Sequence, residues 1–598
     1  MEPIIIQPFA SRFETPRVRI SLEAFENSGI EIFGTERIPF ADRTGPAFAK
    51  NLVRLLVARV QKLQKSGGSF PNGIHIYELG AGTGLLAKRV LDLLKNNHPE
   101  IYRKTILHLS DISKQTVAQL KALEAFKEHR GRVSFEVIDA TKPKFKFKPL
   151  LVYFTNLIDS IPYQRHILIK DGQIYEVQIQ TSLKEDAQII DATSYPPKIL
   201  EQKEISGLVS SPNPTRRLIL APQILTVLEE KSKFVPIAEV ANISQEERED
   251  LEKLAKSKVQ YQPLVFNYSF LARTAIREII RGLDNGGFIF FSDFGIATME
   301  REQVLHIECG LLIFFSVNFP SLKQLAETAG KTCYLTANPL GFPQEMLIDT
   351  FVNDEQMGNL FEKKSVDETP KCVQNFLEEA KKIVSESREE EGLKSEKIRG
   401  LYRSLPAEAK VDFLLLNNLA LFLTQAGLYQ EADFYADLLP ENYGHGVGAI
   451  YYLVKGKVKQ AEGKLQEAEE FFQKAVTAEG GRVLLPYIYL GELYCQQKRY
   501  REYIDVTKKY LKNIRKRGHL RGMVSIGAAQ EKLFRSEAAR STLKMVAALG
   551  RKLKTISNSE KEALKQAEQW LEDDRSCVRG AVFVNPVRDA VSNGINLN

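Results

Sequence analysis

The sequence predicts an α/β domain with a mostly parallel sheet, followed by an all-helical region. Between residues 74 and 139, short β-rich runs alternate with helical patterns in the order IHIYEL, LLAKRVLDLL, TILHLSD, KQTVAQLKALEAF and VSFEVID. This alternation is typical of βαβ units, in which helices cover a parallel sheet. A glycine-rich turn at residues 80–84 joins the first strand to the first helix. Beyond residue 406 the pattern is helical and repeats at a regular spacing, which indicates stacked helical units.

Further strands follow the alternating region. The apolar runs PLLVYFTN and FIFFSDFG are predicted to join the same sheet, because unbroken apolar strands suit a sheet that is buried on both faces. Asp171 and Gly172 lie between two alternating runs and predict a β-hairpin. Residues 181–268 do not fit the alternation and are predicted to be an insertion or lid.

Composition narrows the class of protein. The net charge of +7 is small beside 82 basic and 75 acidic residues, so overall charge gives no case for nucleic acid as a partner. The basic run at 508–522 is either a solvated helix face or a binding patch. No apolar run approaches the roughly 20 residues of a membrane span. The five cysteines are far apart and show no metal-binding spacing, so we expect a cytoplasmic protein without a bound metal.

The turn after the first strand has the pattern E-x-G-x-G-x-G, from Glu78 to Gly84. A dinucleotide-binding turn would need glycine at position 85, which is Leu85, and a phosphate loop would need G-K-[ST]. Neither pattern is present. Glycines that weaken both strand and helix usually lie where a ligand or another part of the backbone comes close.

This motif resembles the first motif of class I S-adenosylmethionine-dependent methyltransferases, which have a Rossmann-like domain. The resemblance implies S-adenosyl-L-methionine as the cofactor, lying across the strand ends over the glycines. Glu78 would place its methionine end, Asp111 would accept the ribose hydroxyls, and Asp139 would lie near the adenine amino group. The alternative for both aspartates is a loop acid or a helix cap. The predicted cofactor-binding residues are Glu78, Gly80, Ala81, Gly82, Thr83, Gly84, Asp111 and Asp139.

A narrower resemblance begins at the end of the fourth strand. The segment TNLIDSIPYQRHILIKDGQIYEV is similar to part of the MidA-type methyltransferases, whose relatives include a mitochondrial protein arginine methyltransferase that assists assembly of respiratory complex I. The resemblance implies a protein substrate. Asp159 and Pro162 match the family pattern, but the family's Asn-Glu pair falls on Thr155 and Asn156, so an amide replaces a carboxylate. The early segment ADRTGPAFAKNLVRLL also lacks the family's glutamate.

The candidate catalytic residues are Asn156 and Asp159, at the carboxyl end of the fourth strand. Methyl transfer depends chiefly on proximity and alignment, and either side chain could orient the acceptor nitrogen. Tyr163 is a candidate for the pocket wall. Alternatively, Asp159 caps a short turn, Asn156 satisfies backbone groups and Tyr163 is packed. The proline pair of DNA amino-methyltransferases is absent, which disfavours a nucleic-acid substrate.

The helical region contains four aligned segments, whose matching positions Gly427, Gly463, Lys498 and Phe534 are 36, 35 and 36 residues apart. The segments resemble tetratricopeptide repeats, which implies a concave surface that binds a protein. Chance spacing in an ordinary helical bundle is the alternative. Small residues recur in the first helix of each unit at Ala420, Gly456, Gly491 and Gly527, and in the second at Ala432, Ala468 and Ala538. Tyr429, Leu465 and Tyr500 are expected to fill the groove between units, and Tyr503 departs by replacing a small residue.

These patterns divide the chain into a methyltransferase-like domain at 1–350, a charged helical linker at 351–405, a repeat domain at 406–572 and a tail at 573–598. The predicted function is methylation of a nitrogen in a protein side chain, arginine by resemblance, with the repeats recruiting the partner. The alternative is an inactive scaffold that keeps the cofactor crevice and acts through its repeats.

Overall fold

The structure is a computed structural model of the 598-residue chain. It describes residues 4–28, 45–122, 124–191, 193, 197–256, 263–297, 305–336, 344–351, 354–362, 369–386, 390–410, 413–443, 448–477, 485–513, 519–533, 535–553 and 558–572. The predicted repeat position Phe534 and the predicted tail lie outside these residues.

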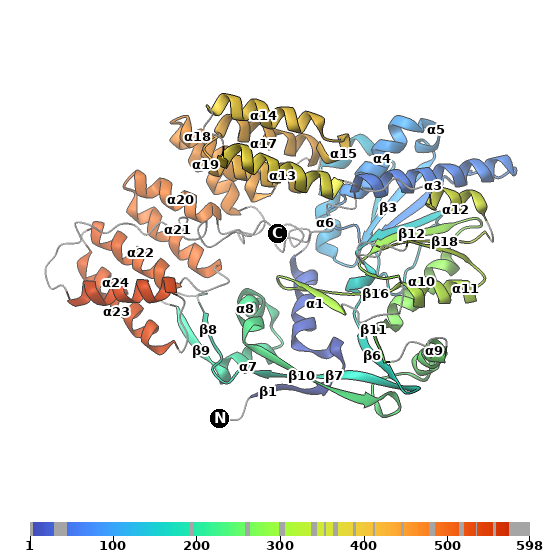
Figure 1. Cartoon of the computed structure of the whole chain (residues 1–598), viewed down its shortest axis with the longest axis horizontal. Helices are drawn as coiled ribbons and strands as arrows, with labels where there is room; N and C mark the ends of the chain where they lie inside the picture. Colours follow the sequence, from blue (N-terminus) through green and yellow to red (C-terminus); the bar gives the residue numbers. More distant parts are fainter. Residues whose placement is uncertain are drawn as a thin grey trace.

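The larger sheet in the described part of the chain has seven strands in the order β17-β18-β12-β5-β2-β3-β4 (Figure 1). Five of them run parallel, and β18 and β17 are antiparallel to the strands they pair with. The prediction of a mostly parallel α/β sheet is therefore confirmed. The strands are β2 (Ile74–Leu79), β3 (Thr105–Asp111), β4 (Val133–Val137), β5 (Leu151–Thr155), β12 (Phe288–Asp293), β17 (Thr332–Leu335) and β18 (Gln344–Asp349).

Apolar cores lie on both faces of this sheet. One core includes residues of α3, α4 and α12, and the other includes residues of α10 and α11. Burial on both faces explains why β5 and β12 read as unbroken apolar runs. The helices that cover the sheet are α3 (Gly45–Lys65), α4 (Leu85–Asn97), α6 (Lys114–Ala122), α10 (Phe270–Gly282), α11 (Phe319–Thr328) and α12 (Glu355–Glu362).

A second, antiparallel sheet lies below the first in Figure 1. Its hairpin turns at Asp171 and Gly172, with φ of 52° and 76°, so the predicted hairpin is confirmed. The described residues between 181 and 268 add no strand to the larger sheet and instead help to complete this one. Its strands are β1 (Ile5–Ala10), β6 (Gln164–Lys170), β7 (Gln173–Leu183), β10 (Leu228–Pro236) and β11 (Leu264–Ser269).

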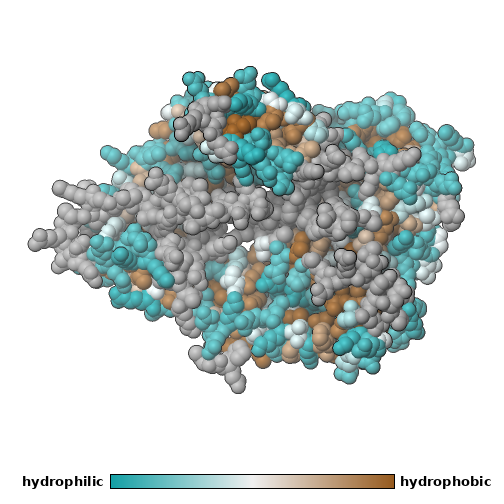
Figure 2. All heavy atoms as spheres, in the orientation of Figure 1, coloured by the Kyte–Doolittle hydropathy of each residue, from teal (hydrophilic) through white to brown (hydrophobic). Residues whose placement is uncertain are grey.

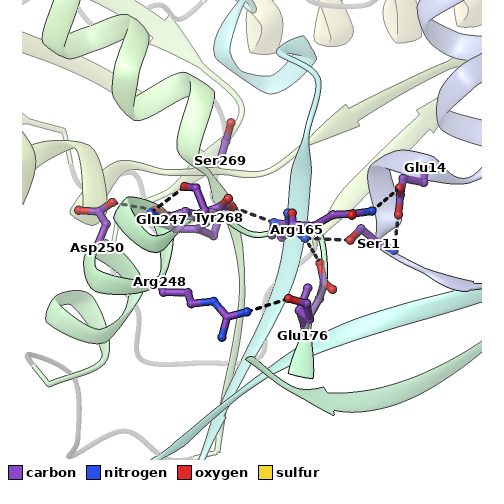
Figure 3. A network of polar contacts seen from close by, with 12 residues as sticks. Ser11, Glu14, Arg165, Glu176, Glu247, Arg248, Asp250, Tyr268 and Ser269 are labelled. Atoms are coloured by element: carbon purple, nitrogen blue, oxygen red, sulfur yellow. Dashed lines mark hydrogen bonds and ion pairs between the residues drawn. The ribbon is translucent and has the colours of Figure 1, made fainter. Parts of the chain in front are cut away.

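A buried ion network centred on Arg165 holds the second sheet to its neighbours (Figure 3). The guanidinium donates to Glu176 Oε1 at 2.6 Å, to Glu247 Oε1 at 2.8 Å and to Ser11 Oγ at 2.8 Å. These partners come from β7, from α9 (Gln245–Lys256) and from the segment before the short helix η1 (Arg12–Glu14). Removal of a single partner would leave buried charge unpaired, which costs far more than an exposed ion pair contributes.

The helices after residue 369 follow one another from α4 round to the hairpin formed by β8 (Gln188–Asp191) and β9 (Lys198–Glu201) (Figure 1). In this orientation hydrophilic residues cover most of the surface around α5 (Pro99–Tyr102), with smaller hydrophobic patches (Figure 2). The helices are α13 (Thr369–Glu386), α14 (Glu391–Ser404), α15 (Ala407–Lys410), α16 (Phe413–Gln425), α17 (Tyr429–Tyr443), α18 (Ala449–Ala461), α19 (Leu465–Thr477), α20 (Leu485–Gln496), α21 (Tyr500–Asn513), α22 (His519–Lys532), α23 (Ser536–Lys552) and α24 (Asn558–Glu572).

The segment expected to be a linker is packed into cores on either side. Met357 and Phe361 of α12 belong to the core of the larger sheet, whereas Phe376 and Ile398 of α13 and α14 belong to the core of the helical region. Each helix has an apolar face among its charged residues, and burial of that face draws it onto its neighbour. No helix that the structure describes has the length and apolar character needed to cross a membrane.

Three of the aligned repeat positions perform the same role in turns between paired helices. Gly427, Gly463 and Lys498 have φ of 81°, 77° and 58°. In each turn the next residue donates its N–H to a carbonyl five positions earlier, at 3.0, 2.9 and 2.8 Å respectively. This arrangement ends a helix in the left-handed conformation that glycine adopts most easily. The spacing read from the sequence therefore marks real helix-turn-helix units.

Small residues in the first helices make room for aromatic rings. A Cβ at Gly456 would lie 2.5 Å from the ring of Phe472, and one at Gly491 would lie 3.4 Å from the ring of Tyr503. Tyr503, which departs from the repeat pattern, is thus accommodated opposite a glycine.

The helical region and the larger sheet are in contact. Leu85, the first residue of α4, packs against the apolar core formed by α13, α14, α16, α17 and α18. At the other end of the helical region, Gln188 Nε2 donates to the Lys552 carbonyl at 3.3 Å.

These contacts predict opposite effects for two identical substitutions. Gly456→Ala should lower the free energy of unfolding by about 1–3 kcal/mol, since its methyl group overlaps the Phe472 ring. Gly491→Ala should be neutral or raise it by roughly 0.5–1 kcal/mol, because its methyl group makes an ordinary contact and alanine favours a helix. Urea denaturation followed by circular dichroism measures both. Equal destabilisation would contradict the packing described here.

Candidate functional site

The carboxyl edge of the larger sheet contains a topological switch point between β2 and β5. From β2 the chain proceeds outward to β3 and β4, and then returns to place β5 on the other side of β2. Ligands of open α/β sheets bind in the crevice that forms where the strand order reverses. The candidate residues all lie at the ends of strands at this edge or directly after them. They comprise the glycine turn at 80–84, Asp111, Asp139, Asn156 and Asp159.

The glycine turn runs directly from β2 into α4. Gly80, Gly82 and Gly84 have φ of 65°, 51° and 74°, a conformation that other residues adopt only with strain. Ala81 N donates to the Ser110 carbonyl at 2.9 Å and so fixes the turn against β3.

Two of these glycines contact the chain's own side chains. A Cβ at Gly80 would lie 2.9 Å from Leu157 Cδ1, and one at Gly84 would lie 2.8 Å from Leu120 Cδ2. At these two positions the bare backbone therefore makes room for side chains of the chain itself. Gly80 also brings the turn against the loop that follows β5.

Glu78 lies in the sheet just before the turn and is almost completely buried. Tyr153 Oη, from the paired position on β5, donates to Glu78 Oε2 at 3.0 Å. Burial raises the pKa of Glu78 to about 8, although the hydrogen bond from Tyr153 opposes the shift. At neutral pH the side chain is therefore largely protonated and can itself donate a hydrogen bond.

Asp111 ends β3 beside the glycine turn. Its Oδ1 accepts from Ser113 N at 2.9 Å. Burial raises the pKa of Asp111, and the backbone N–H groups of Ser113, Gly82 and Ile112 oppose that shift. Ser113 Oγ, rather than Asp111, accepts from Thr116 N near the start of α6. Ser113 thus supplies the helix cap that was the alternative role for Asp111. The Asp111 carboxylate lies beside Gly82 of the glycine turn.

Asp139 is exposed after β4. Its Oδ1 accepts from Thr141 N at 2.9 Å and from Thr141 Oγ1 at 2.7 Å. These local bonds match the loop-acid alternative for Asp139. They leave its role toward adenine a prediction.

The loop after β5 is strained at both ends. Asn156 and Tyr163 have φ of 50° and 65°, which is uncommon for residues other than glycine and concentrates at functional sites. Asn156 N donates to the Ser292 carbonyl at 3.0 Å, but its side-chain Nδ2 has no partner among the described residues. Tyr163 is half exposed, and its ring centroid lies 4.9 Å from that of Phe13.

Between these two residues, Asp159 forms a buried acid pair with Asp293 of β12. Asp293 Oδ2 accepts from the N–H groups of Leu157 and Ile158 at 3.0 and 2.8 Å, and its Oδ1 accepts from Phe294 N at 2.8 Å. Neither carboxyl oxygen of Asp159 has a partner of good hydrogen-bond geometry among the described residues, although the N–H and hydroxyl of Ser160 lie close enough to lower its pKa. The alternative that Asp159 caps a turn therefore stays open.

The two carboxyls influence each other's protonation. Burial raises the pKa of Asp159 well above its usual range, and the neighbouring Asp293 carboxyl adds to the shift. Burial raises the pKa of Asp293 to about 7, and its three backbone donors oppose the shift. Two carboxyls this close do not both ionise readily, so the pair holds a proton at neutral pH.

Sequence reasoning missed Asp293 and Tyr153. The run FIFFSDFG was recognised as a strand, but a carboxylate at the carboxyl end of a buried strand was itself a signal. Nothing in the sequence showed that Tyr153 would lie opposite Glu78, because the pairing of β5 with β2 depends on the order of the strands in the sheet.

The residues at this edge fit a nucleoside cofactor. Glu78, Asp111 and Asp139 lie at or just beyond the carboxyl ends of β2, β3 and β4, where carboxyl groups can bond to the hydroxyl and amino groups of a nucleoside. Ile112 adds an apolar side chain that is 61% exposed. The described residues contain no cluster of three or more His, Cys, Asp or Glu side chains arranged to hold a metal ion.

Residues 52–306 match a protein family described as "Putative S-adenosyl-L-methionine-dependent methyltransferase". The match supports a methyltransferase and confirms the predicted cofactor, S-adenosyl-L-methionine. No curated protein matches the chain.

Solved structures give weaker likenesses. An uncharacterized protein from Burkholderia thailandensis is 13% identical over 56% of this chain and 92% of its own, with a TM-score of 0.33. Another protein from that organism, bound to S-adenosyl-homocysteine, is 15% identical over 52% of this chain and 78% of its own, with a TM-score of 0.32. The MamA protein is 16% identical over 35% of this chain and 99% of its own, with a TM-score of 0.24. Scores this low do not establish a shared fold.

The raised pKa of Glu78 predicts a dependence of stability on pH. The folded state keeps this proton up to about pH 8, whereas the unfolded state loses it near 4.5, so the contribution of Glu78 to stability falls as pH rises between these values. The fall is at most about 1.4 kcal/mol per pH unit. Glu78→Gln, which mimics the protonated form, should therefore gain stability relative to wild type from pH 5 to pH 8. Urea denaturation at several pH values would contradict this if the difference stayed constant.

Proposed function

We propose that this protein is an S-adenosyl-L-methionine-dependent methyltransferase that acts on a nitrogen of a protein side chain. The observation that carries the proposal is the buried Asp159–Asp293 pair, which lies at the switch point beside the glycine turn. The family match over residues 52–306 includes both the turn and the pair, and therefore supports the same site.

The cofactor would lie along the carboxyl ends of β2, β3 and β4. Protonated Glu78 would donate toward its methionine end, Asp111 would accept from the ribose hydroxyls, and Asp139 would approach the adenine amino group. When bound, S-adenosyl-L-methionine supplies a methyl group that is activated by the attached sulfonium.

The acid pair would hold the acceptor nitrogen. A nitrogen that gains a methyl group must give up one proton, and Asp293, whose pKa lies near neutrality, is the member of the pair that can take it. Asn156, at the strained start of the same loop, adds a side-chain amide whose Nδ2 has no partner among the described residues.

Arginine is the proposed side chain, by resemblance to the MidA-type enzymes. Its guanidinium needs acceptors that hold the planar fork. Asn156 stands where those enzymes have a carboxylate, and Asp293 offers a second carboxyl from another strand.

The helical region would recruit the protein substrate. We infer that its units are tetratricopeptide repeats, because the left-handed turn residues and the small residues that face aromatic rings recur at the same spacing. Leu85, the residue directly after the glycine turn, packs against the apolar core of this region.

A second candidate is a scaffold without catalytic activity. The contacts of Leu157 and Leu120 with the glycine turn favour it, since side chains at that position narrow the space for a cofactor. Such a protein would act through its helices alone.

Replacement of both acids separates the two candidates. The double variant Asp159→Asn, Asp293→Asn preserves the shapes of the two side chains but leaves neither able to accept a proton, so methyl transfer should fall about 10²–10⁴-fold while cofactor binding is kept. Radiolabelled S-adenosyl-L-methionine, incubated with proteins that co-purify with the chain, measures transfer, and calorimetry measures binding.

The matched control is Asp505→Asn, an exposed position on α21, which should transfer methyl groups at the wild-type rate. Equal transfer by the double variant and wild type would show that the acid pair is not catalytic. Cofactor binding without transfer in the wild type would favour the scaffold.

A further inference from the structure

A row of lysines follows Asp139 on the segment between β4 and β5. Lys142, Lys144, Lys146 and Lys148 alternate with other residues in the run KPKFKFK and are all exposed. We call these four side chains the lysine strip. Among the residues that the structure describes, none of the four forms an ion pair, in contrast to Lys88 on α4, which pairs with Asp92.

Aromatic rings anchor this segment to the sheet. The Phe147 ring stacks on His75 at 4.3 Å with an angle of 6° between the rings, and Phe147 N donates to Tyr77 Oη at 3.2 Å. The Phe145 ring meets Tyr77 edge-on at 4.8 Å. Both phenylalanine rings therefore contact residues of the sheet, while the four lysines are exposed, with the Lys146 ammonium 5.5 Å from the centroid of the Phe147 ring.

Acids near the strip are engaged with other groups. Glu136 Oε1 accepts from His108 Nδ1 at 2.7 Å, Asp139 bonds to Thr141, and Asp284 Oδ1 accepts from Asn285 N at 2.9 Å. These acids keep their negative charge, but none of them forms an ion pair with the strip among the described residues, and the strip lies on a segment that its aromatic rings anchor to the sheet.

We propose that the lysine strip binds an acidic segment of a partner protein in an extended conformation. The segment bends at Lys142, Lys146 and Phe147, so the four lysines do not form one straight row. In an extended partner, carboxylates at every second position lie on one face about 6.6 Å apart, and successive carboxylates could meet different lysines of the strip. This binding is separate from methyl transfer and does not depend on it.

Two other polyanions fit the strip less well. Nucleic acid is commonly held by arginine forks and by exposed rings that stack on bases, whereas this row contains only lysines and Phe147 stacks on His75. Membrane surfaces bind amphipathic segments whose several apolar side chains enter the lipid. Phe147, 40% exposed, is the large apolar residue that the strip exposes.

The test uses the full chain and a fluorescent peptide in which glutamate alternates with threonine. Fluorescence anisotropy should show binding that weakens as salt is added. Replacement of all four lysines by glutamine should weaken binding by at least about tenfold. A peptide with the same composition, but with its glutamates in one block, should bind less tightly than the alternating one.

The control changes four exposed lysines from other surfaces, Lys121, Lys203, Lys253 and Lys256, to glutamine. It alters net charge equally and should bind the peptide as tightly as wild type. Unchanged melting temperatures would show that both variants are folded.

Three results would overturn the proposal. Equal binding by the strip variant and wild type would exclude the strip as the site. Equal weakening in the control would show that net charge alone attracts the peptide. Binding of phosphatidylserine vesicles or a single-stranded oligonucleotide, without binding of the peptide, would assign the strip to a membrane or to nucleic acid.

Discussion

The candidate site depends on the Asp293 carboxylate and on the hydrogen bonds that it accepts from three backbone N–H groups. Two of these donors, Leu157 and Ile158, belong to the loop after β5. This loop carries Asn156 and Asp159, and its Leu157 side chain rests on Gly80. A single carboxyl at the end of β12 thus positions the acid pair and also the wall of the glycine turn. Its burial is costly for a charged group, and the three donors offset part of that cost.

A separate contact, made by Leu85, joins the glycine turn to the helical region. Gly84 ends the glycine turn, and Leu85 directly after it enters the apolar core of α13, α14 and α16–α18. The turn is therefore held between the loop after β5 on one side and the helices on the other.

Local patterns in the sequence predicted the elements, and long-range pairing decided the site. The parallel strands, the hairpin at Asp171 and Gly172, and the turns at Gly427, Gly463 and Lys498 all follow from short periodic signals, and the structure contains them. The acid pair could not be predicted in this way, because four of the five strands of the second sheet lie between Asp159 and Asp293 in the sequence. The segment expected as a charged helical linker at 351–405 contains α12, α13 and α14, and their apolar faces pack into the cores on either side. Those contacts could not be read from the segment alone, because the partners lie elsewhere in the chain.

The central claim is that the edge between β2 and β5 binds S-adenosyl-L-methionine, and calorimetry on two glycine variants tests it most directly. Gly82 and Gly131 both have a left-handed backbone, with φ of 51° and 76°, and nothing lies within 4 Å of a Cβ placed at Gly131. Valine at either position introduces similar backbone strain, but only at Gly82 would it enter the proposed site. The account predicts that wild type and Gly131→Val bind the cofactor and that Gly82→Val does not. Equal binding by all three proteins, or by none, would contradict it.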